Sequence, residues 1–239
     1  ARDARIQTQH VLIYDHCLIM MMMVTSSISA ANLFLFFLVV FTTPSPHLVQ
    51  ACYPCVDSPT HHLQVTYNGL GTFTSLGFYD PIFRSAALFR LPQDPKRIAP
   101  TFDLYTRNSR VQAERLLYND SQSVLDSNFN GEKPTKIVVH GYRDGARFGG
   151  WMEQMKNRLL NYEDCNVLLL DWSGGAAGSY GQAMVNTQVV GAMLAEMIRS
   201  IKHSVNSVDE GGPHLDFHVI GEGLGAYVGG VAASKITSS

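Results

Sequence analysis

Three short glycine-containing motifs in this 239-residue sequence have the composition of a catalytic or anion-binding site. They are His140-Gly141-Tyr142, Asp171-Trp172-Ser173-Gly174-Gly175 and Gly221-Glu222-Gly223-Leu224-Gly225. Each motif lies at the end of a short apolar run, so each is expected where a strand ends. Because ligands of open α/β sheets bind at the carboxyl ends of the strands, the sequence predicts that these motifs share one site.

The third motif, taken alone, has three interpretations. It is similar to the nucleophile elbow of α/β-hydrolases, G-x-S-x-G, a tight strand-to-helix turn that presents a serine to the substrate. Gly221 and Gly225 supply the frame, but the centre is Gly223, which carries no hydroxyl group. Gly221, Gly223 and Ala226 also match the dinucleotide fingerprint G-x-G-x-x-G/A, which places a pyrophosphate at a helix N-terminus. A glycine-rich turn without a ligand is the third interpretation.

Alternating strands and helices must position these motifs. Apolar runs predict strands at residues 136–140, 166–171 and 217–220, and their lack of alternation is typical of strands covered on both faces. Helices are predicted at 151–160, at roughly 181–203 and at 226–235, the second because apolar residues recur with helical spacing from Val190 to Ile201. This order predicts an α/β fold with a parallel sheet and helices on both faces.

The sequence divides into four parts. These are residues 1–19, interpreted as upstream read-through or a fragment end; 20–51, a signal peptide; 52–135, an N-terminal arm and the first part of the main domain; and 136–239, the α/β core through the glycine-framed turn. The apolar run at 33–41 has the length of a secretory h-region, and Val49 and Ala51 suit cleavage after Ala51. A strand at 102–105 is expected to enter the domain.

Composition argues against several classes of protein. The net charge is −2, from 18 basic and 20 acidic residues, so no basic field favours nucleic acid as a partner. No apolar run reaches the roughly 18–20 residues that span a bilayer, which argues against a transmembrane segment. Cys52, Cys55 and Cys165 remain after the predicted cleavage and do not form paired C-x-x-C motifs, so neither a metal nor a cofactor is expected. Asn119-Asp120-Ser121 fits the N-glycosylation pattern of a secreted protein.

The segments KIVVHGY, DCNVLLLDWSGGAAGSYGQAMVNTQVVGAMLAEMI and FHVIGEGLGAYVGGVAA together resemble the pancreatic-type (neutral) lipase family. Members of that family have HGF or HGY, then VDW, then N-x-x-x-VG at a long helix, then HVIGHSLGAH, in this order and at similar spacing. Cys52-Tyr53, Asn68-Gly69-Leu70-Gly71 and Leu91-Pro92-Gln93 are similar to segments of the family's N-terminal arm. The resemblance covers residues 52–239 and implies an α/β-hydrolase fold, incomplete at the C-terminus.

The resemblance also implies roles for individual residues. The backbone N–H groups of Tyr142 and Leu224 match the two donors of the oxyanion hole, each worth about 3–4 kcal/mol when aimed at a developing oxyanion. Glu222 occupies the position before the nucleophile. Asp171 is interpreted as an acceptor that orders a loop, and His140, although near enough to be considered as a base, is structural in the family. His218 is interpreted as a packed core histidine.

Two departures from the family pattern lead us to expect an inactive protein. Gly223 occupies the nucleophile position, and the sequence ends 16 residues later, before the family's catalytic Asp and His. The expected function is therefore that of a secreted lipase-family protein with a carrier, storage or yolk-like role, whose partner is a lipid or a lipid surface bearing acyl esters. The alternative is an active triglyceride or phospholipid lipase whose sequence is truncated or misread at residue 223. A dinucleotide-binding α/β protein is a remote alternative.

The leader assignment predicts where the secreted protein begins. Cleavage after Ala51 should leave Cys52 as the first residue, because the apolar h-region ends just before small or apolar residues at the positions that signal peptidase reads. N-terminal sequencing of material secreted from a eukaryotic host measures this directly. A secreted protein that still contains residues 33–41 would contradict the assignment.

Overall fold

The computed structural model describes residues 63–75, 77, 90–146, 149–206 and 215–237. The predicted leader, Cys52 and Cys55 therefore lie outside the described residues. The elements are β1 (Gln64–Tyr67), β2 (Gly71–Thr74), α1 (Pro95–Ile98), β3 (Thr101–Tyr105), β4 (Glu114–Leu116), α2 (Ser121–Leu125), β5 (Thr135–Val139), α3 (Trp151–Tyr162), β6 (Asn166–Asp171), α4 (Ser173–Ala176), α5 (Tyr180–Asn206), β7 (Phe217–Gly221) and α6 (Leu224–Thr237). The three core strands and their helices agree with the predicted ones to within a few residues.

The main sheet has the strand order β4-β3-β6-β5-β7 and is mixed, not parallel throughout. β5 pairs in parallel with both β6 and β7, as predicted. β3 instead pairs antiparallel with β6, and β4 antiparallel with β3, so the expectation of a parallel sheet was wrong for this edge. A parallel neighbour requires a crossover connection of a dozen or more residues, whereas β4 follows β3 after a short loop and can only fold back antiparallel.

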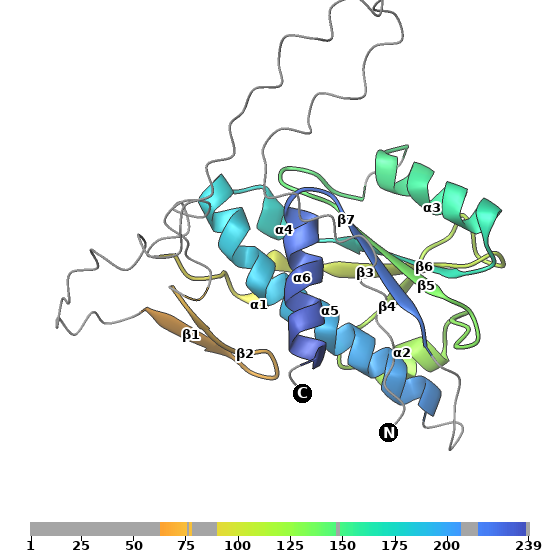
Figure 1. Cartoon of the computed structure of the whole chain (residues 1–239), viewed down its shortest axis with the longest axis horizontal. Helices are drawn as coiled ribbons and strands as arrows, with labels where there is room; N and C mark the ends of the chain where they lie inside the picture. Colours follow the sequence, from red (N-terminus) through yellow and green to blue (C-terminus); the bar gives the residue numbers. More distant parts are fainter. Residues whose placement is uncertain (1–62, 76, 78–89, 147–148, 207–214, 238–239) are drawn as a thin grey trace, which may run out of the picture. The chain divides into compact units, whose positions relative to one another are not determined.

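Helices cover both faces of the sheet, which explains the continuous apolar runs of the core strands (Figure 1). Ile137, Val139, Leu168, Leu170 and Phe217 belong to one apolar cluster with α5 and α6. Val138, Val167 and Leu169, which alternate with them, belong to a second cluster with Met152 and Leu160 of α3. Because successive strand residues point to opposite faces, a strand buried on both sides must be apolar at every position.

The long helix α5 lies across the sheet and packs against α6 (Figure 1). The apolar positions predicted from helical spacing, Val190, Met193, Leu194, Met197, Ile198 and Ile201, are all buried. At Gly191 the two helices approach so closely that an added Cβ would lie 2.6 Å from Cβ of Val231 and 2.8 Å from the carbonyl oxygen of Val228. No helix among the described residues is long and apolar enough to cross a membrane.

A matched pair of helical glycines tests this close approach. Gly191→Ala should lower the free energy of unfolding by about 1–2 kcal/mol, because the clash with Val231 outweighs the better helix propensity of alanine. Gly230→Ala in α6, where an added Cβ meets nothing within 4 Å, should instead raise that free energy by about 0.5–1 kcal/mol. Urea unfolding followed by circular dichroism measures both. Equal shifts for the two variants would show that α5 and α6 do not pack in this way.

Candidate functional site

The glycine-framed motif forms a sharp turn between β7 and α6. β7 ends at Gly221, and α6 begins at Leu224. Two hydrogen bonds close the turn, from the N–H of Gly225 to the carbonyl of Glu222 (2.8 Å) and from the N–H of Ala226 to the carbonyl of Gly223 (3.1 Å). Gly223 at the centre has a φ of +52°, in the left-handed region that side chains rarely adopt. A strand, a sharp turn and a helix in this order form the setting expected of an elbow motif.

The two frame glycines and the central glycine are under different constraints. A Cβ on Gly221 would lie 2.5 Å from the carbonyl oxygen of Gly225, and a Cβ on Gly225 would lie 2.7 Å from the carbonyl oxygen of His140 and against that of Val139. No side chain fits at either position without moving backbone. A Cβ on Gly223, in contrast, would meet nothing within 4 Å. The space at the centre of the turn can therefore hold a side chain, and only the positive φ opposes one.

The close packing of Gly225 brings the elbow against the end of β5. The N–H of Glu222 also donates to the carbonyl of Val139 (3.0 Å), which continues the pairing of β7 with β5 past the strand end. Tyr142 follows two residues after His140, and Leu224 opens α6, so the two proposed oxyanion donors lie at the same edge of the sheet. Within the part of the chain that the structure describes, neither of their backbone N–H groups has an intramolecular acceptor. An unpaired N–H at a helix N-terminus is suited to a negatively polarised oxygen.

His140 is a buried residue that joins two strand ends, and its side chain is not available as a base. Its side chain is 0% exposed, and it stacks on Trp172 with 5.5 Å between ring centroids. Its Nδ1 lies 2.9 Å from the carbonyl oxygen of Gly141, and its Nε2 accepts from the backbone N–H of Trp172 at 2.9 Å. The indole N–H of Trp172 donates back to the carbonyl of His140 at 2.7 Å. In this arrangement Nε2 accepts, and the contacts hold the ends of β5 and β6 together, which agrees with the structural role expected.

Asp171 orders the loops that follow β5 and β6, as predicted. Its carboxylate accepts from the N–H of Ser173 (2.9 Å) and from the N–H of Ala146 (3.2 Å). Burial by itself would raise the pKa of this carboxyl, but the hydrogen bonds donated by Ser173 hold the pKa below its usual range. Since Nε2 of His140 already accepts from Trp172, the 3.2 Å contact between Nε2 and Asp171 joins two acceptors. The N–H groups of Ser173 and Ala146 are therefore the donors that keep Asp171 ionised.

An aromatic surface that the sequence analysis missed adjoins the proposed oxyanion donors. The ring of Tyr142 meets the ring of Tyr180 edge to face, with centroids 5.2 Å apart, and the Tyr142 hydroxyl donates to the carbonyl of Gly178 at 3.0 Å. The guanidinium of Arg143 lies 5.1 Å from the centroid of the Tyr142 ring. Tyr180 is 47% exposed. The contact between Tyr142 and Tyr180 could not be predicted because the two residues are far apart in sequence, although each follows one of the glycine-containing motifs.

A buried polar network fixes the start of α5 against the N-terminal arm. Asn186 accepts from the backbone N–H of Gln93 (2.9 Å) and donates to its side-chain oxygen (2.9 Å) and to the carbonyl of Gly175 (2.9 Å). Gln182, one turn earlier, donates to the carbonyl of Leu91 at 2.9 Å. The asparagine of the N-x-x-x-VG motif and the Leu91-Pro92-Gln93 segment therefore form one structural unit. They position the loop after β6 and do not line the elbow.

The remaining residues singled out from the sequence lie elsewhere. His218 is half-buried on β7, so it is less enclosed than the core histidine expected. Asn119 is exposed, with a φ of 62°, in the turn before α2. Cys165 is buried and unpaired, and burial raises the pKa of its thiol, so it is a poor nucleophile. Among the described residues, no group of His, Cys, Asp and Glu side chains could hold a metal ion.

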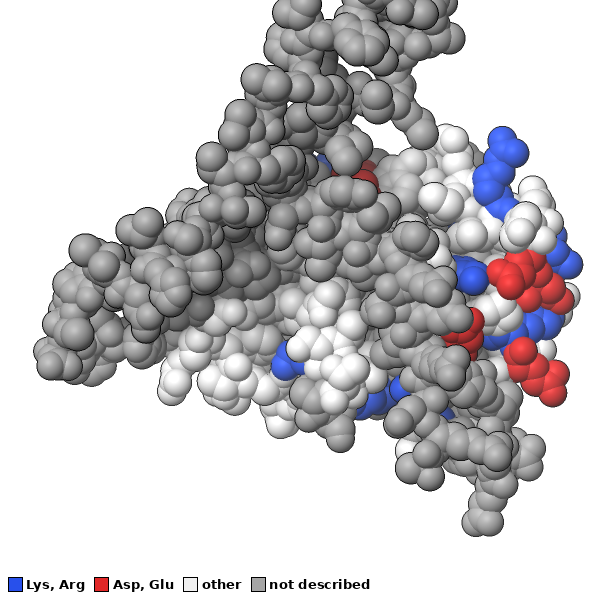
Figure 2. All heavy atoms as spheres, viewed as in Figure 1, with Lys and Arg blue, Asp and Glu red and all other residues white. Residues whose placement is uncertain are grey.

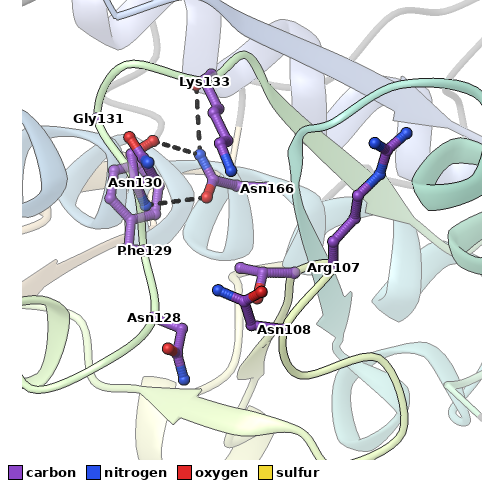
Figure 3. A pocket seen from close by; sticks show the side chains of 9 residues that line it. Arg107, Asn108, Asn128, Phe129, Asn130, Gly131, Lys133 and Asn166 are labelled. Atoms are coloured by element: carbon purple, nitrogen blue, oxygen red, sulfur yellow. Dashed lines mark hydrogen bonds between the residues drawn. The ribbon is translucent and has the colours of Figure 1, made fainter.

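A polar cavity of about 340 Å³ lies at the opposite end of the sheet from the elbow (Figure 3). It is lined by Thr106, Arg107, Asn108, Asn128, Phe129, Asn130, Gly131, Lys133 and Asn166. Asn166, the first residue of β6, uses its side-chain amide to bind the backbone of Asn130 and the carbonyl of Lys133, and Lys133 forms an ion pair with Asp164 (2.8 Å). These polar groups hold the loop before β5 in place.

Charged side chains of both signs are intermixed on the face that Figure 2 shows.

Comparisons with known proteins agree with this geometry. A family model described as Lipase matches residues 63–239. The chain is 32% identical to pancreatic lipase-related protein 2 of Cavia porcellus over 61% of this chain and 32% of that protein. It is 32% identical to inactive pancreatic lipase-related protein 1 of Homo sapiens, over 72% and 35%, and 31% identical to pancreatic triacylglycerol lipase of Myocastor coypus, over 72% and 36%. The chain thus spans about a third of the length of these relatives.

The family match covers every element of the main sheet and both halves of the elbow. The dinucleotide interpretation is thereby displaced, because the glycines at 221 and 225 are explained by an elbow packed on β5. By its sequence match and its α/β-hydrolase architecture, this chain belongs to the lipase family, as a pancreatic-type member.

Proposed function

We propose that this protein is a secreted lipase-family member that binds acyl lipids without hydrolysing them. The observation that carries the proposal is Gly223, which stands at the centre of an otherwise complete elbow. Ester hydrolysis by this family's route needs a side-chain nucleophile at that point, and loss of such a serine lowers kcat by about 10⁶-fold in a serine hydrolase. The unpaired N–H groups of Tyr142 and Leu224 support binding, because main-chain donors do not depend on the residue at 223.

The surroundings of the elbow suit an uncharged ester or hydroxyl group attached to an acyl chain. Two N–H donors lie at the sheet edge, and the rings of Tyr142 and Tyr180 form an aromatic surface next to them. Aromatic rings provide large apolar area, which suits the acyl chain, while the donors suit its carbonyl or hydroxyl oxygen. A relative named as an inactive pancreatic lipase-related protein shows that family members described as inactive exist. A carrier or storage role, including a yolk-like one, follows from binding without turnover.

Secretion and glycosylation form part of the same proposal. The exposed side chain of Asn119, in a turn before α2, is accessible to a glycan. Asp120 caps α2 through the N–H groups of Gln122 and Ser123, so the sequon lies in an ordered turn. A glycan on Asn119 should therefore be detectable as a mass increase that an N-glycosidase removes.

A second candidate function, an active triglyceride or phospholipid lipase with serine at residue 223, is favoured by one observation. A Cβ at this position meets nothing within 4 Å, so the turn has room for the family's serine. The backbone is already in the left-handed conformation that the turn needs. Sequencing of the genomic locus and its transcript distinguishes the two functions, because they differ in one codon.

The absence of a nucleophile predicts no serine-type chemistry. The unmodified protein should not be labelled by a serine-directed phosphonate and should not hydrolyse a short-chain ester, because residue 223 carries no side chain. Binding of a monoacylglycerol with a fluorescent acyl chain, measured by anisotropy, should nevertheless be saturable. Labelling of the unmodified protein would overturn the proposal, as would failure to bind the lipid.

Substitution at residue 223 tests the elbow itself. Gly223→Ser should cost about 1–2 kcal/mol of stability because of the positive φ. In the 239-residue chain, the variant should stay nearly inactive, since a serine without its base remains protonated. In a form extended by the family's Asp and His, phosphonate labelling should rise by about 10³-fold or more. Gly223→Ala has the same backbone cost without a hydroxyl group and is the matched control, which should remain unlabelled in both forms.

A further inference from the structure

The side chain of Glu222 lies against Gly141, next to the loop that carries Tyr142. A Cβ on Gly141 would lie 3.0 Å from the carboxyl carbon of Glu222, against its Oε2, and 2.8 Å from its backbone carbonyl oxygen. The carboxylate therefore lies over Gly141, the residue before Tyr142. Glycine at 141 is what makes room for it. Glu222 is itself exposed to solvent.

No neighbouring group among the described residues neutralises this charge. Arg143 lies over the ring of Tyr142 and forms no ion pair with Glu222 within the described part of the chain. Asp171, the other carboxylate at this edge, accepts from the N–H groups of Ser173 and Ala146. Its negative charge is thus compensated by N–H groups of the loops, whereas the Glu222 carboxylate has no such partner among the described residues. The elbow therefore combines N–H donors with an adjacent uncompensated negative charge.

We propose that Glu222 makes the elbow selective for neutral acyl lipids, such as acylglycerols, over fatty-acid anions. This inference rests on the proposed lipid-binding function. An ester carbonyl or a hydroxyl oxygen accepts from the N–H groups of Tyr142 and Leu224 without meeting a like charge. A fatty-acid carboxylate on the same donors would approach the Glu222 carboxylate, and repulsion between the two like charges weakens its binding. The elbow then retains an acyl ester and releases the free acid.

Two ligands with the same labelled acyl chain, the free fatty acid and its glycerol monoester, measure this selectivity. At pH 8 the fatty acid is ionised. The unmodified protein should bind the ester more tightly than the acid. Glu222→Gln keeps the size of the side chain and removes its charge, so affinity for the acid should rise about tenfold while affinity for the ester stays within about twofold. Glu132→Gln removes an exposed charge at the opposite end of the sheet and should change neither affinity.

Ionic strength gives a second measurement that does not depend on any variant. Raising the salt concentration of the unmodified protein from about 0.05 M to 0.5 M shortens the screening length and should raise the ratio of acid affinity to ester affinity. Taking the ratio cancels the general effect of salt on apolar binding. Ester binding with a ratio that neither Glu222→Gln nor salt changes would overturn the selectivity and leave the proposed function standing. Failure to bind either ligand would overturn both.

Discussion

The site depends on one close backbone contact, in which the elbow packs on the end of β5 with no room for a side chain at Gly225. The carbonyl groups of Val139 and His140 occupy the space where a Cβ would stand. This contact lets α6 begin directly beside the loop that carries Tyr142, so that two backbone N–H groups from different elements lie at one edge. An added methyl group would have to push backbone apart, because interiors are close-packed and yield little. The placement of these two N–H groups is therefore a consequence of glycine packing as much as of hydrogen bonding.

A second layer of contacts holds the strand ends that carry the site. His140 and Trp172 exchange hydrogen bonds in both directions across the carboxyl ends of β5 and β6. Asp171 extends this link to the loop after β5 through Ala146. The polar atoms of these residues are occupied by hydrogen bonds within the protein. Buried polar groups that are fully paired in this way make an arrangement rigid and specific. They support the strand ends without being available for chemistry themselves.

The frame and the centre of the turn are under different constraints. Gly221 and Gly225 are required by packing, whichever residue stands between them. No neighbouring atom excludes a side chain at residue 223. Glycine nevertheless tolerates the positive φ of this residue better than any other amino acid. Glycine at this point therefore avoids the backbone strain that a side chain would incur. The proposed binding role, which uses main-chain donors, is compatible with glycine at this point.

The sequence by itself determined the core elements, because their signals are local. The uninterrupted apolar runs at β5, β6 and β7 and the helical spacing in α5 placed these elements to within a few residues, and the glycine frame with its two flanking motifs indicated the elbow and its family. Only the tertiary structure decided the antiparallel edge of β3 and β4, the hydrogen-bond partners of His140, the pairing of Tyr142 with Tyr180, and the position of Glu222 over Gly141. Each of these rests on contacts between segments that are distant in sequence. Residue type and spacing along the chain do not show which side chains meet across the sheet edge. Burial and secondary-structure periodicity, in contrast, can be recognised from the sequence of each segment alone.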